Sequence, residues 1–356
     1  MNEALDYPKN DFIANYLLIL EENNLPDWQR KKLKKKIEKK DKKGNLVFPK
    51  MGANWLWRLC AADLMRGNFN RWYGFEYRSK WAYIMSDPHD FCYRKWDGEP
   101  CRLLLMAEQG IGDEILFAST FHELLTHNPD TTIECDSRLL PVFNRAFKGS
   151  CISRWINDEI NHSKSPQHYF PDHPYSPGEF DCYLPAADCL RSFRTKRNPP
   201  GTPYLTADPK RVEDYKEKLK DYPKPWIGVS WLGGRSFLEP EKLRKGDGTY
   251  IDFQYGEHDT PEWMIKVDCD HNDMEDVFAL CKALDKVYTV QNYTVHVAGS
   301  LGKECHAVKP YKQYGEVGFD DSTNNRLKWA YGTGVRKWTM PWYNSVTVYN
   351  SWQEFQ

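Results

Sequence analysis

The chain has 356 residues, of which 40% are hydrophobic and 15% aromatic, and its formal net charge is −1 at pH 7. This length suits two folded domains with a smaller third piece, and the aromatic content excludes a disordered protein or a fibre. The longest uncharged apolar runs, such as Leu103–Ala107, are far shorter than the roughly 20 residues of a membrane span.

The spacing of the cysteines and the first 20 residues both bear on whether the protein is expected in the cytoplasm or outside the cell. The ten cysteines are dispersed, and no two are close enough for a CxxC pair, so neither a zinc knuckle nor a redox pair is expected. Residues 1–20 contain no basic segment followed by an apolar one, so no secretory signal is expected. We therefore expect reduced thiols, a cytoplasmic location, no membrane span and no metal site.

Charge is unevenly distributed along the chain. The segment Arg30–Lys43 holds ten Lys or Arg against Glu38 and Asp41, a local charge of +8. Such a run can attract nucleic acid or an anionic surface, or it can be a solvated helix face. No aromatic residues interleave with these lysines, so a base-stacking platform is not indicated.

The first 95 residues carry helical signals. Hydrophobic residues between 10 and 20 fall at helical spacing, and Asn54–Arg66 is an amphipathic stretch that ends at Gly67. Aromatic residues continue to Arg78, as in the second half of a helical hairpin. Because stacked repeats normally need about three units, we expect residues 1–95 to form a repeat-like helical cap on the neighbouring domain.

From Arg102 onward, short apolar runs alternate with amphipathic stretches. Leu103–Ala107 is continuous and uncharged, which is typical of a strand buried on both faces. Further strands are predicted at Thr132–Cys135 and Phe180–Leu184, and helices at Glu114–Thr126 and Arg138–Phe147, the latter with Ser137 as its N-cap. This alternation predicts a parallel, doubly wound sheet.

A proline-rich segment, Pro199–Pro203, is expected to link two domains. The alternation then restarts, with strands predicted at Trp226–Trp231, Tyr250–Tyr255 and Val287–Val290, and helices at Asp208–Lys220, Met274–Leu284 and Thr294–Leu301. The expected fold class is α/β, with a helical N-terminal region over residues 1–95. Two Rossmann-like doubly wound domains, over residues 96–203 and 204–356, are expected to face a cleft.

A glycine motif follows the first predicted strand. Gln109, Gly110 and Gly112 precede or begin a helix, where glycines let backbone N–H groups approach a ligand and the helix terminus favours negative charge. Asp113 at this terminus is stabilised in its ionised form and can accept a proton from an attacking hydroxyl. The alternative is a capping aspartate after a tight turn. The third glycine of a dinucleotide fingerprint is missing.

A second polar turn follows the strand predicted at Val287–Val290. Asn292, Tyr293 and Thr294 lie where exposed amides and hydroxyls can hold a diphosphate. His296, one turn into the next helix, either donates to a phosphate oxygen or fills the domain core.

Several motifs in the same order resemble those of one family. Ala107–Ala118 resembles the first loop of the GT-B glycosyltransferase-like domains found behind tetratricopeptide repeats. These domains are related to the bacterial heptosyltransferases and distantly to the O-linked N-acetylglucosamine transferases. The other similar motifs are Leu64–Arg78, Tyr204–Asp208, Ile227–Trp231, Phe253–Glu257, Val295–Gly302 and Trp342-Tyr343. The resemblance covers nearly all of the chain beyond residue 60.

The resemblance implies a GT-B enzyme that moves a sugar from a nucleotide-sugar to a hydroxyl acceptor, with inversion and without a metal ion or cofactor. Asp113 matches the aspartate proposed as the base in heptosyltransferases, and the Gln109–Gly112 loop would hold phosphate or acceptor. Asn292, Thr294 and His296 fall in or beside the diphosphate-binding turn, and Gln254 lies in a second-domain strand that faces the cleft.

The chain also departs from the family pattern. Gln291-Asn292 stands where the family commonly has Asp-Thr, which removes a carboxylate from the turn. After Gly233-Gly234 comes an unusually charged segment, Glu239–Gly248. Arg235, directly after Gly234, and three cations of this segment can neutralise a diphosphate leaving group or are solvated loop charges; the three are Lys242, Arg244 and Lys245.

Two other functions stay open. The first is a glycosyltransferase acting on nucleic acid, which would use Arg30–Lys43 to hold the polymer. The second is a binding module that kept the GT-B-like fold without its chemistry. The acceptor class is therefore open among a saccharide, a protein and a nucleic acid, DNA included.

Overall fold

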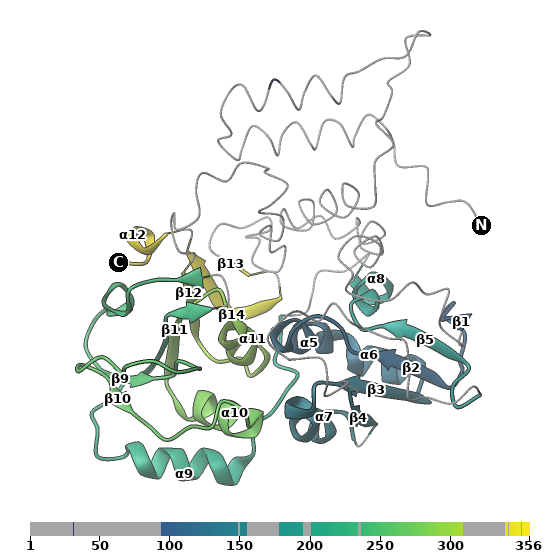
Figure 1. The fold of residues 1–356 in the computed structure, drawn as a ribbon, viewed down its shortest axis with the longest axis horizontal. Helices are drawn as coiled ribbons and strands as arrows, with labels where there is room; N and C mark the ends of the chain where they lie inside the picture. The colour runs from purple at the N-terminus through teal and green to yellow at the C-terminus, as the bar shows by residue number, and fades with distance from the viewer. Residues whose placement is uncertain are drawn as a thin grey trace.

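The structure, a computed structural model, describes residues 31, 94–148, 150–154, 178–194, 201–233, 236–308, 339–340, 342–349 and 351–356. It contains two mostly parallel β-sheets with helices packed on them, so the α/β class is confirmed. Figure 1 shows the first sheet in blue and teal and the second in green and yellow. In this part of the chain, no helix is long and apolar enough to cross a bilayer.

The first sheet has the strand order β1-β5-β2-β3-β4, and all of its strand pairs are parallel. Its strands are β1 (Arg94–Lys95), β2 (Leu103–Met106), β3 (Thr131–Cys135), β4 (Cys151–Ser153) and β5 (Cys182–Pro185). Its helices are α5 (Ile111–Phe117), α6 (Phe121–His127), α7 (Leu140–Phe147) and α8 (Asp188–Arg194), with 3₁₀ segments η4 (Ala118–Thr120) and η5 (Ser137–Leu139).

Strand β2 is buried on both faces, as its uncharged sequence predicts. Leu103 and Leu105 belong to the main hydrophobic core, while Leu104 and Met106 pack with Tyr183 in a smaller cluster. This division follows the two-residue period of a strand, because successive side chains point to opposite faces.

The second sheet has the order β10-β9-β6-β11-β12-β14-β13, and every pair except β13 with β14 is parallel. Its strands are β6 (Trp226–Ser230), β9 (Thr249–Asp252), β10 (Ile265–Lys266), β11 (Lys286–Val290), β12 (Cys305–Val308), β13 (Thr339–Met340) and β14 (Tyr343–Tyr349). Counted along the sequence, the six parallel strands follow the 3-2-1-4-5-6 order of a doubly wound dinucleotide-binding sheet. The topological switch point therefore lies between β6 and β11.

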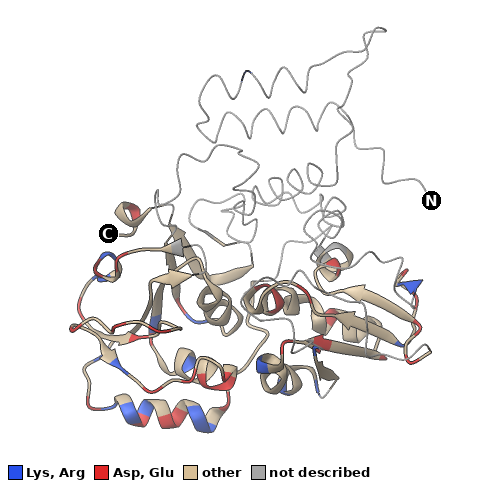
Figure 2. Ribbon diagram, in the orientation of Figure 1, with Lys and Arg blue, Asp and Glu red and all other residues tan. Residues whose placement is uncertain are grey.

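Among its described residues, the second half also contains the helices α9 (Pro209–Leu219), α10 (Met274–Ala283), α11 (Tyr293–Ser300) and α12 (Trp352–Phe355) and the 3₁₀ segment η6 (Pro240–Leu243). The strands β7 (Leu232–Gly233) and β8 (Ser236–Phe237) form a hairpin. Helix α9 begins after the N-cap Asp208, whose carboxylate accepts from Arg211 N. In Figure 2 both basic and acidic residues lie along the length of α9.

The two halves pack directly on each other. Helix α5 of the first half lies against α11 of the second, and Arg145 on α7 forms an ion pair of 2.7 Å with Glu275 on α10. Buried apolar residues from both sheets form one contiguous cluster. The boundary predicted at residue 203 falls between the two sheets, while β1 begins at Arg94, just before the boundary predicted at residue 95. The three-part domain division stays a prediction.

Several predicted elements differ from the observed ones. Asp136 caps the segment before α7 by accepting from Arg138 N, so the prediction of Ser137 as N-cap was wrong. The helix predicted at Glu114–Thr126 begins earlier, at Ile111, and is divided by η4. The glycine loop after β6 contains the β7–β8 hairpin, and the strand predicted to reach Tyr255 ends at Asp252.

Candidate functional site

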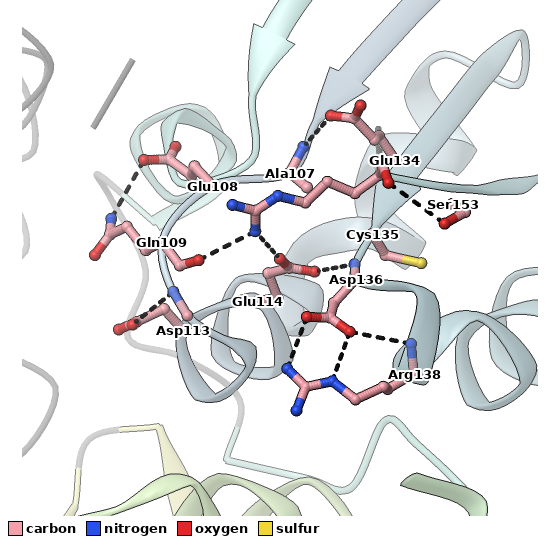
Figure 3. Close-up of polar contacts among 12 residues, drawn as sticks. Ala107, Glu108, Gln109, Asp113, Glu114, Glu134, Cys135, Asp136, Arg138 and Ser153 are labelled. Carbon is pink, nitrogen blue, oxygen red and sulfur yellow. Dashed lines mark hydrogen bonds and ion pairs between the residues drawn. The ribbon is translucent and has the colours of Figure 1, made fainter. Parts of the chain in front are cut away.

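The loop between β2 and α5 is fixed by buried carboxylates (Figure 3). Glu134 on β3 accepts from Ala107 N at 3.0 Å, and Glu108 accepts from Ala187 N at 2.9 Å. Both side chains are almost fully buried. Gln109, the next residue, has a φ of 65°, a left-handed conformation that non-glycine residues seldom adopt. The loop therefore has one defined conformation, set by carboxylates from neighbouring segments.

Glu114 links three loops at the carboxyl ends of β2, β3 and β4. Its Oε1 lies 2.9 Å from Arg154 Nη1, and its Oε2 accepts from Asp136 N at 2.8 Å. The same Arg154 nitrogen donates to Gln109 O at 3.1 Å. Burial raises the pKa of Glu114 to about 8, although the Arg154 guanidinium opposes this increase. Glu114 lies centrally in Figure 3. The sequence motifs singled out neither Glu114 nor Arg154.

Asp113 is half-buried on the first turn of α5, where its Oδ2 accepts from Gly110 N at 3.3 Å. Gly110 is the N-cap residue, so the carboxylate reaches back to the cap of its own helix. The capping alternative considered for this aspartate is therefore observed. A role as catalytic base stays a proposal, which the capping contact does not prevent because a carboxylate has four acceptor positions.

Gly112 brings the two sequence motifs into contact. A Cβ atom built on Gly112 would lie 3.1 Å from His296 Cδ2 and 3.2 Å from Tyr293 Cα. This glycine therefore lets α5 approach the first turn of α11 closely. By contrast, the contact given for a Cβ on Gly110 within the described part of the chain is with Asp113 Oδ2, at an ordinary 3.6 Å. The glycine motif thus serves helix packing at Gly112, a role that the sequence did not predict.

Asn292 and Gln254 fix the chain at the switch point of the second sheet. Asn292 Nδ2 donates to Ser230 Oγ at 2.8 Å and to Leu232 O at 3.1 Å, while its Oδ1 caps α11 by accepting from Thr294 N. Gln254 Oε1 accepts from Trp231 N and Leu232 N, at 2.9 and 2.8 Å. We call Ser230, Leu232, Gln254 and Asn292 the switch-point network.

Two residues predicted to bind the donor, Gln254 and Asn292, have structural roles in the switch-point network, and their donor-binding role stays a prediction. Gln254 and Asn292 are 3% and 6% exposed, and their carboxamides are used in holding the segment after β6. Gln254 also lies beyond the end of β9 instead of within the strand. These two side chains therefore hold the backbone at the carboxyl edge of the sheet.

The first turn of α11 holds the other predicted donor-binding residues. Tyr293 is half-buried, its hydroxyl lies 2.9 Å from His271 Nδ1, and its ring packs on Tyr255 at 4.9 Å. Burial raises the pKa of Tyr293. Thr294 Oγ1 is buried and has no hydrogen-bond partner in the described part of the chain. His296 is 4% exposed, and its Nδ1 lies 3.0 Å from Tyr343 Oη.

The charged segment after the hairpin makes contacts of its own. Arg235 lies outside the described residues. Lys242 pairs with Glu239 at 2.6 Å, Arg244 stacks over Trp263, and Lys245 donates to Phe355 O. Lys245 lies near the amino end of β9, since its backbone N–H donates to Tyr250 Oη at 2.9 Å, whereas the switch-point network lies at the carboxyl ends of the strands. Among the described residues, no group of three or more His, Cys, Asp or Glu is arranged to hold a metal ion.

Buried carboxylates were the main part of this region that the sequence analysis missed. Glu134 lies within β3, Glu108 lies two residues after β2, and Glu114 follows Asp113 directly. A charged residue inside or directly after an otherwise apolar strand was the available signal, because such a residue must find a partner when buried.

Comparison with known proteins gives one distant relative. The chain is 25% identical over 316 residues to Protein FlbA of Caulobacter vibrioides, a match that covers 77% of this chain and 48% of that protein. The chain thus spans about half the length of this curated relative, whose name states no activity. No protein-family model and no solved structure matches the chain.

Proposed function

We propose that the chain is a GT-B type glycosyltransferase that moves a sugar from a nucleotide-sugar to a hydroxyl acceptor. The strand order of the second sheet supports this proposal, because doubly wound sheets bind nucleotides at the switch point. The switch-point network fixes the backbone there, and α11 begins at the same edge. The first turn of a helix has backbone N–H groups without intrahelical partners, which suits a diphosphate.

The contact of Gly112 with Tyr293 and His296 is the observation that carries the proposal. It joins the loop of the proposed base to the helix of the proposed donor site, although the two motifs lie far apart in the sequence. Asp113 follows Gly112 directly, so an acceptor beside α5 would also lie near a donor held at α11. A transferase needs this proximity, because its two substrates must react while both are bound.

In the proposed reaction, Asp113 accepts the proton of the acceptor hydroxyl. The hydroxyl oxygen bonds to the anomeric carbon while the bond from that carbon to the diphosphate oxygen breaks, which inverts the configuration. The negative charge that develops on the diphosphate is stabilised by the N-terminus of α11, without a metal ion. In sequence, Arg235 lies between β7 and β8, the hairpin that contains Leu232 of the switch-point network, and it is the cation that we propose for the same charge.

A screen of nucleotide-sugars tests this function. One member should raise the melting temperature of the protein and should be hydrolysed slowly without acceptor. Asp113→Asn is the matched variant, since an amide oxygen can still accept from Gly110 N while the charge is lost. It should keep the thermal stabilisation and lose the hydrolysis. Absence of both effects for UDP-, GDP-, ADP-, CMP- and dTDP-sugars would refute the proposal.

A binding module is the second candidate function. The capping contact of Asp113 and the saturated carboxamides of Gln254 and Asn292 give these residues structural roles that need no catalysis. Thermal stabilisation by a nucleotide-sugar without hydrolysis, and without transfer to saccharide, protein or DNA acceptors, would favour this candidate. The nucleic-acid alternative depends on Arg30–Lys43, which lies outside the described residues apart from Lys31.

A further inference from the structure

Three hydrogen-bonded side chains connect α11 to α5. His296 Nδ1 lies 3.0 Å from Tyr343 Oη, Tyr343 Oη lies 3.3 Å from Tyr204 Oη, and Tyr204 Oη lies 2.6 Å from Ile115 O. We call this series the tyrosine relay. Tyr343 and His296 are buried, and Gly299 provides the space in which the Tyr343 ring lies.

The end of the tyrosine relay determines the direction of its hydrogen bonds. A backbone carbonyl only accepts, so Tyr204 must donate its hydrogen to Ile115 O. The single hydroxyl hydrogen of Tyr204 is then used, so the contact between the two hydroxyls is a hydrogen bond only if Tyr343 donates to Tyr204. Tyr343 has no second hydrogen, so the contact with His296 is a hydrogen bond only if the Nδ1–H of His296 donates to Tyr343 Oη.

We infer that Tyr204 and Tyr343 are positioning residues that hold neutral His296 in the Nδ1–H tautomer, with the lone pair on Nε2. The ring atom next to Nε2 is Cδ2, which faces Gly112 on α5. Cδ2 and Nε2 are bonded to each other, so the acceptor nitrogen of His296 is one bond from the atom that meets α5, the helix that carries the proposed base. This last step rests on the proposed function, whereas the tautomer does not.

The tautomer limits what His296 does in a donor site. A neutral ring with its hydrogen on Nδ1 has no hydrogen to donate from Nε2, so it cannot donate to a phosphate oxygen. Nε2 instead accepts a hydrogen bond or a proton, and contact with a diphosphate requires the imidazolium form. The sequence left two roles for His296, donation to a phosphate oxygen and filling of the domain core. The first role is thus open to His296 only when its ring is protonated.

A second histidine provides an internal comparison. His306 Nδ1 lies 3.0 Å from Tyr349 Oη, the same distance as in the His296 pair, and its Nε2 lies 2.9 Å from Glu304 Oε1. An ionised carboxylate only accepts, so Nε2 of His306 carries the hydrogen and Nδ1 accepts from Tyr349. Two Tyr–His pairs of equal length are therefore expected to hold opposite tautomers.

Long-range proton–nitrogen NMR of the full chain, labelled with ¹⁵N only in histidine, tests the inference. The spectra are recorded without ligand at mildly alkaline pH, where imidazoles are neutral, because a protonated ring nitrogen and a bare one then resonate far apart. Single variants, His296→Gln and His306→Gln, assign the two rings among the ten histidines. We expect Nδ1–H for His296 and Nε2–H for His306. Nε2–H at His296 in the unaltered protein would overturn the inference.

Two tyrosine variants test the tyrosine relay itself. Tyr204→Phe removes the acceptor of the Tyr343 hydrogen, so Tyr343 should turn to donate to His296 Nδ1 and the ring should change to Nε2–H. Tyr349→Phe is the matched control and should leave His296 unchanged. An unchanged His296 tautomer in folded Tyr204→Phe would refute the relay. Should that variant fail to fold, the spectrum of the unaltered protein still decides. Since no nucleotide-sugar is involved, a wrong tautomer and a missing transferase activity are separate results.

Discussion

The buried carboxyl of Glu114 predicts an unusual dependence of stability on pH. Its pKa in the folded protein is about 8, against an ordinary value of 4.5, mainly because burial disfavours the charged form. Between these two values the folded chain binds the proton more tightly than the unfolded chain does. Glu114 should therefore contribute fully to the free energy of unfolding below about pH 4.5. This contribution should be lost as the pH rises through about 8.

The magnitude follows from the same two pKa values. Each unit of difference corresponds to about 1.4 kcal/mol, so the whole contribution is no more than about 5 kcal/mol. A glutamine at this position cannot ionise. It alters one hydrogen bond, with Arg154 or with Asp136 N, and the free energy lost there is the same at every pH as far as residue 114 is concerned. Glu114→Gln should therefore change the slope of stability against pH.

Urea unfolding at several pH values between about 5 and 8.5 provides the assay. The difference in unfolding free energy between wild type and Glu114→Gln should shift by several kcal/mol across this range, in favour of the variant at high pH. Glu213→Gln is the matched control, since the Glu213 side chain is 70% exposed. Arg154→Met should extend the loss to higher pH, because the guanidinium lowers the pKa of Glu114. Parallel curves for wild type and Glu114→Gln would refute the reasoning.

Further predictions concern the proposed reaction and the packing of the two halves. Asp113→Asn should reduce turnover by roughly 10²–10⁴-fold with little change in donor affinity, and turnover within a few-fold of wild type would exclude it as the base. Activity should survive EDTA, whereas its loss and restoration by manganese or magnesium would contradict metal-independent transfer. Gly112→Ala should lower the free energy of unfolding by about 1–3 kcal/mol through crowding against Tyr293 and His296, in thermal or urea unfolding, and Gly110→Ala should cost clearly less. Replacing the lysines of Arg30–Lys43 with glutamine should flatten the salt dependence of DNA binding, and unchanged affinity at two salt concentrations would remove the main argument for a nucleic-acid acceptor.

The strands that lie deepest were the ones the sequence predicted well. Leu103–Ala107 and Trp226–Trp231 match β2 and β6 within one residue, because a strand buried on both faces needs an uninterrupted apolar run. Strand β14, Tyr343–Tyr349, was missed, since it has a mixed pattern of buried and half-buried residues. Short edge strands such as β4 and β10 have too few residues for any period to be visible.

Side-chain roles in the candidate site were less predictable than its location. The sequence places Asp113 and Asn292 after strands at the correct edges, because strand ends and helix starts have local signals. The partners of these side chains come from distant segments. Nothing near Gly112 in the sequence indicates that α11 will pack against it, and nothing near Glu114 indicates Arg154.

Asn292 departs from the Asp-Thr pattern of the GT-B family that the sequence resembles, and the switch-point network gives this asparagine a structural role. Its amide donates twice, to Ser230 Oγ and Leu232 O, and its carbonyl oxygen caps α11. A threonine could cap the helix but has only one hydrogen to donate, and an aspartate has none. Asparagine is therefore the residue that both begins α11 and holds the segment after β6. Because this change preserves the edge of the sheet on which the donor would bind, the asparagine alone gives no argument for lost activity. Gln291 stands where the GT-B family that the sequence resembles commonly has an aspartate. Measurements of donor binding and turnover must test whether the missing carboxylate matters.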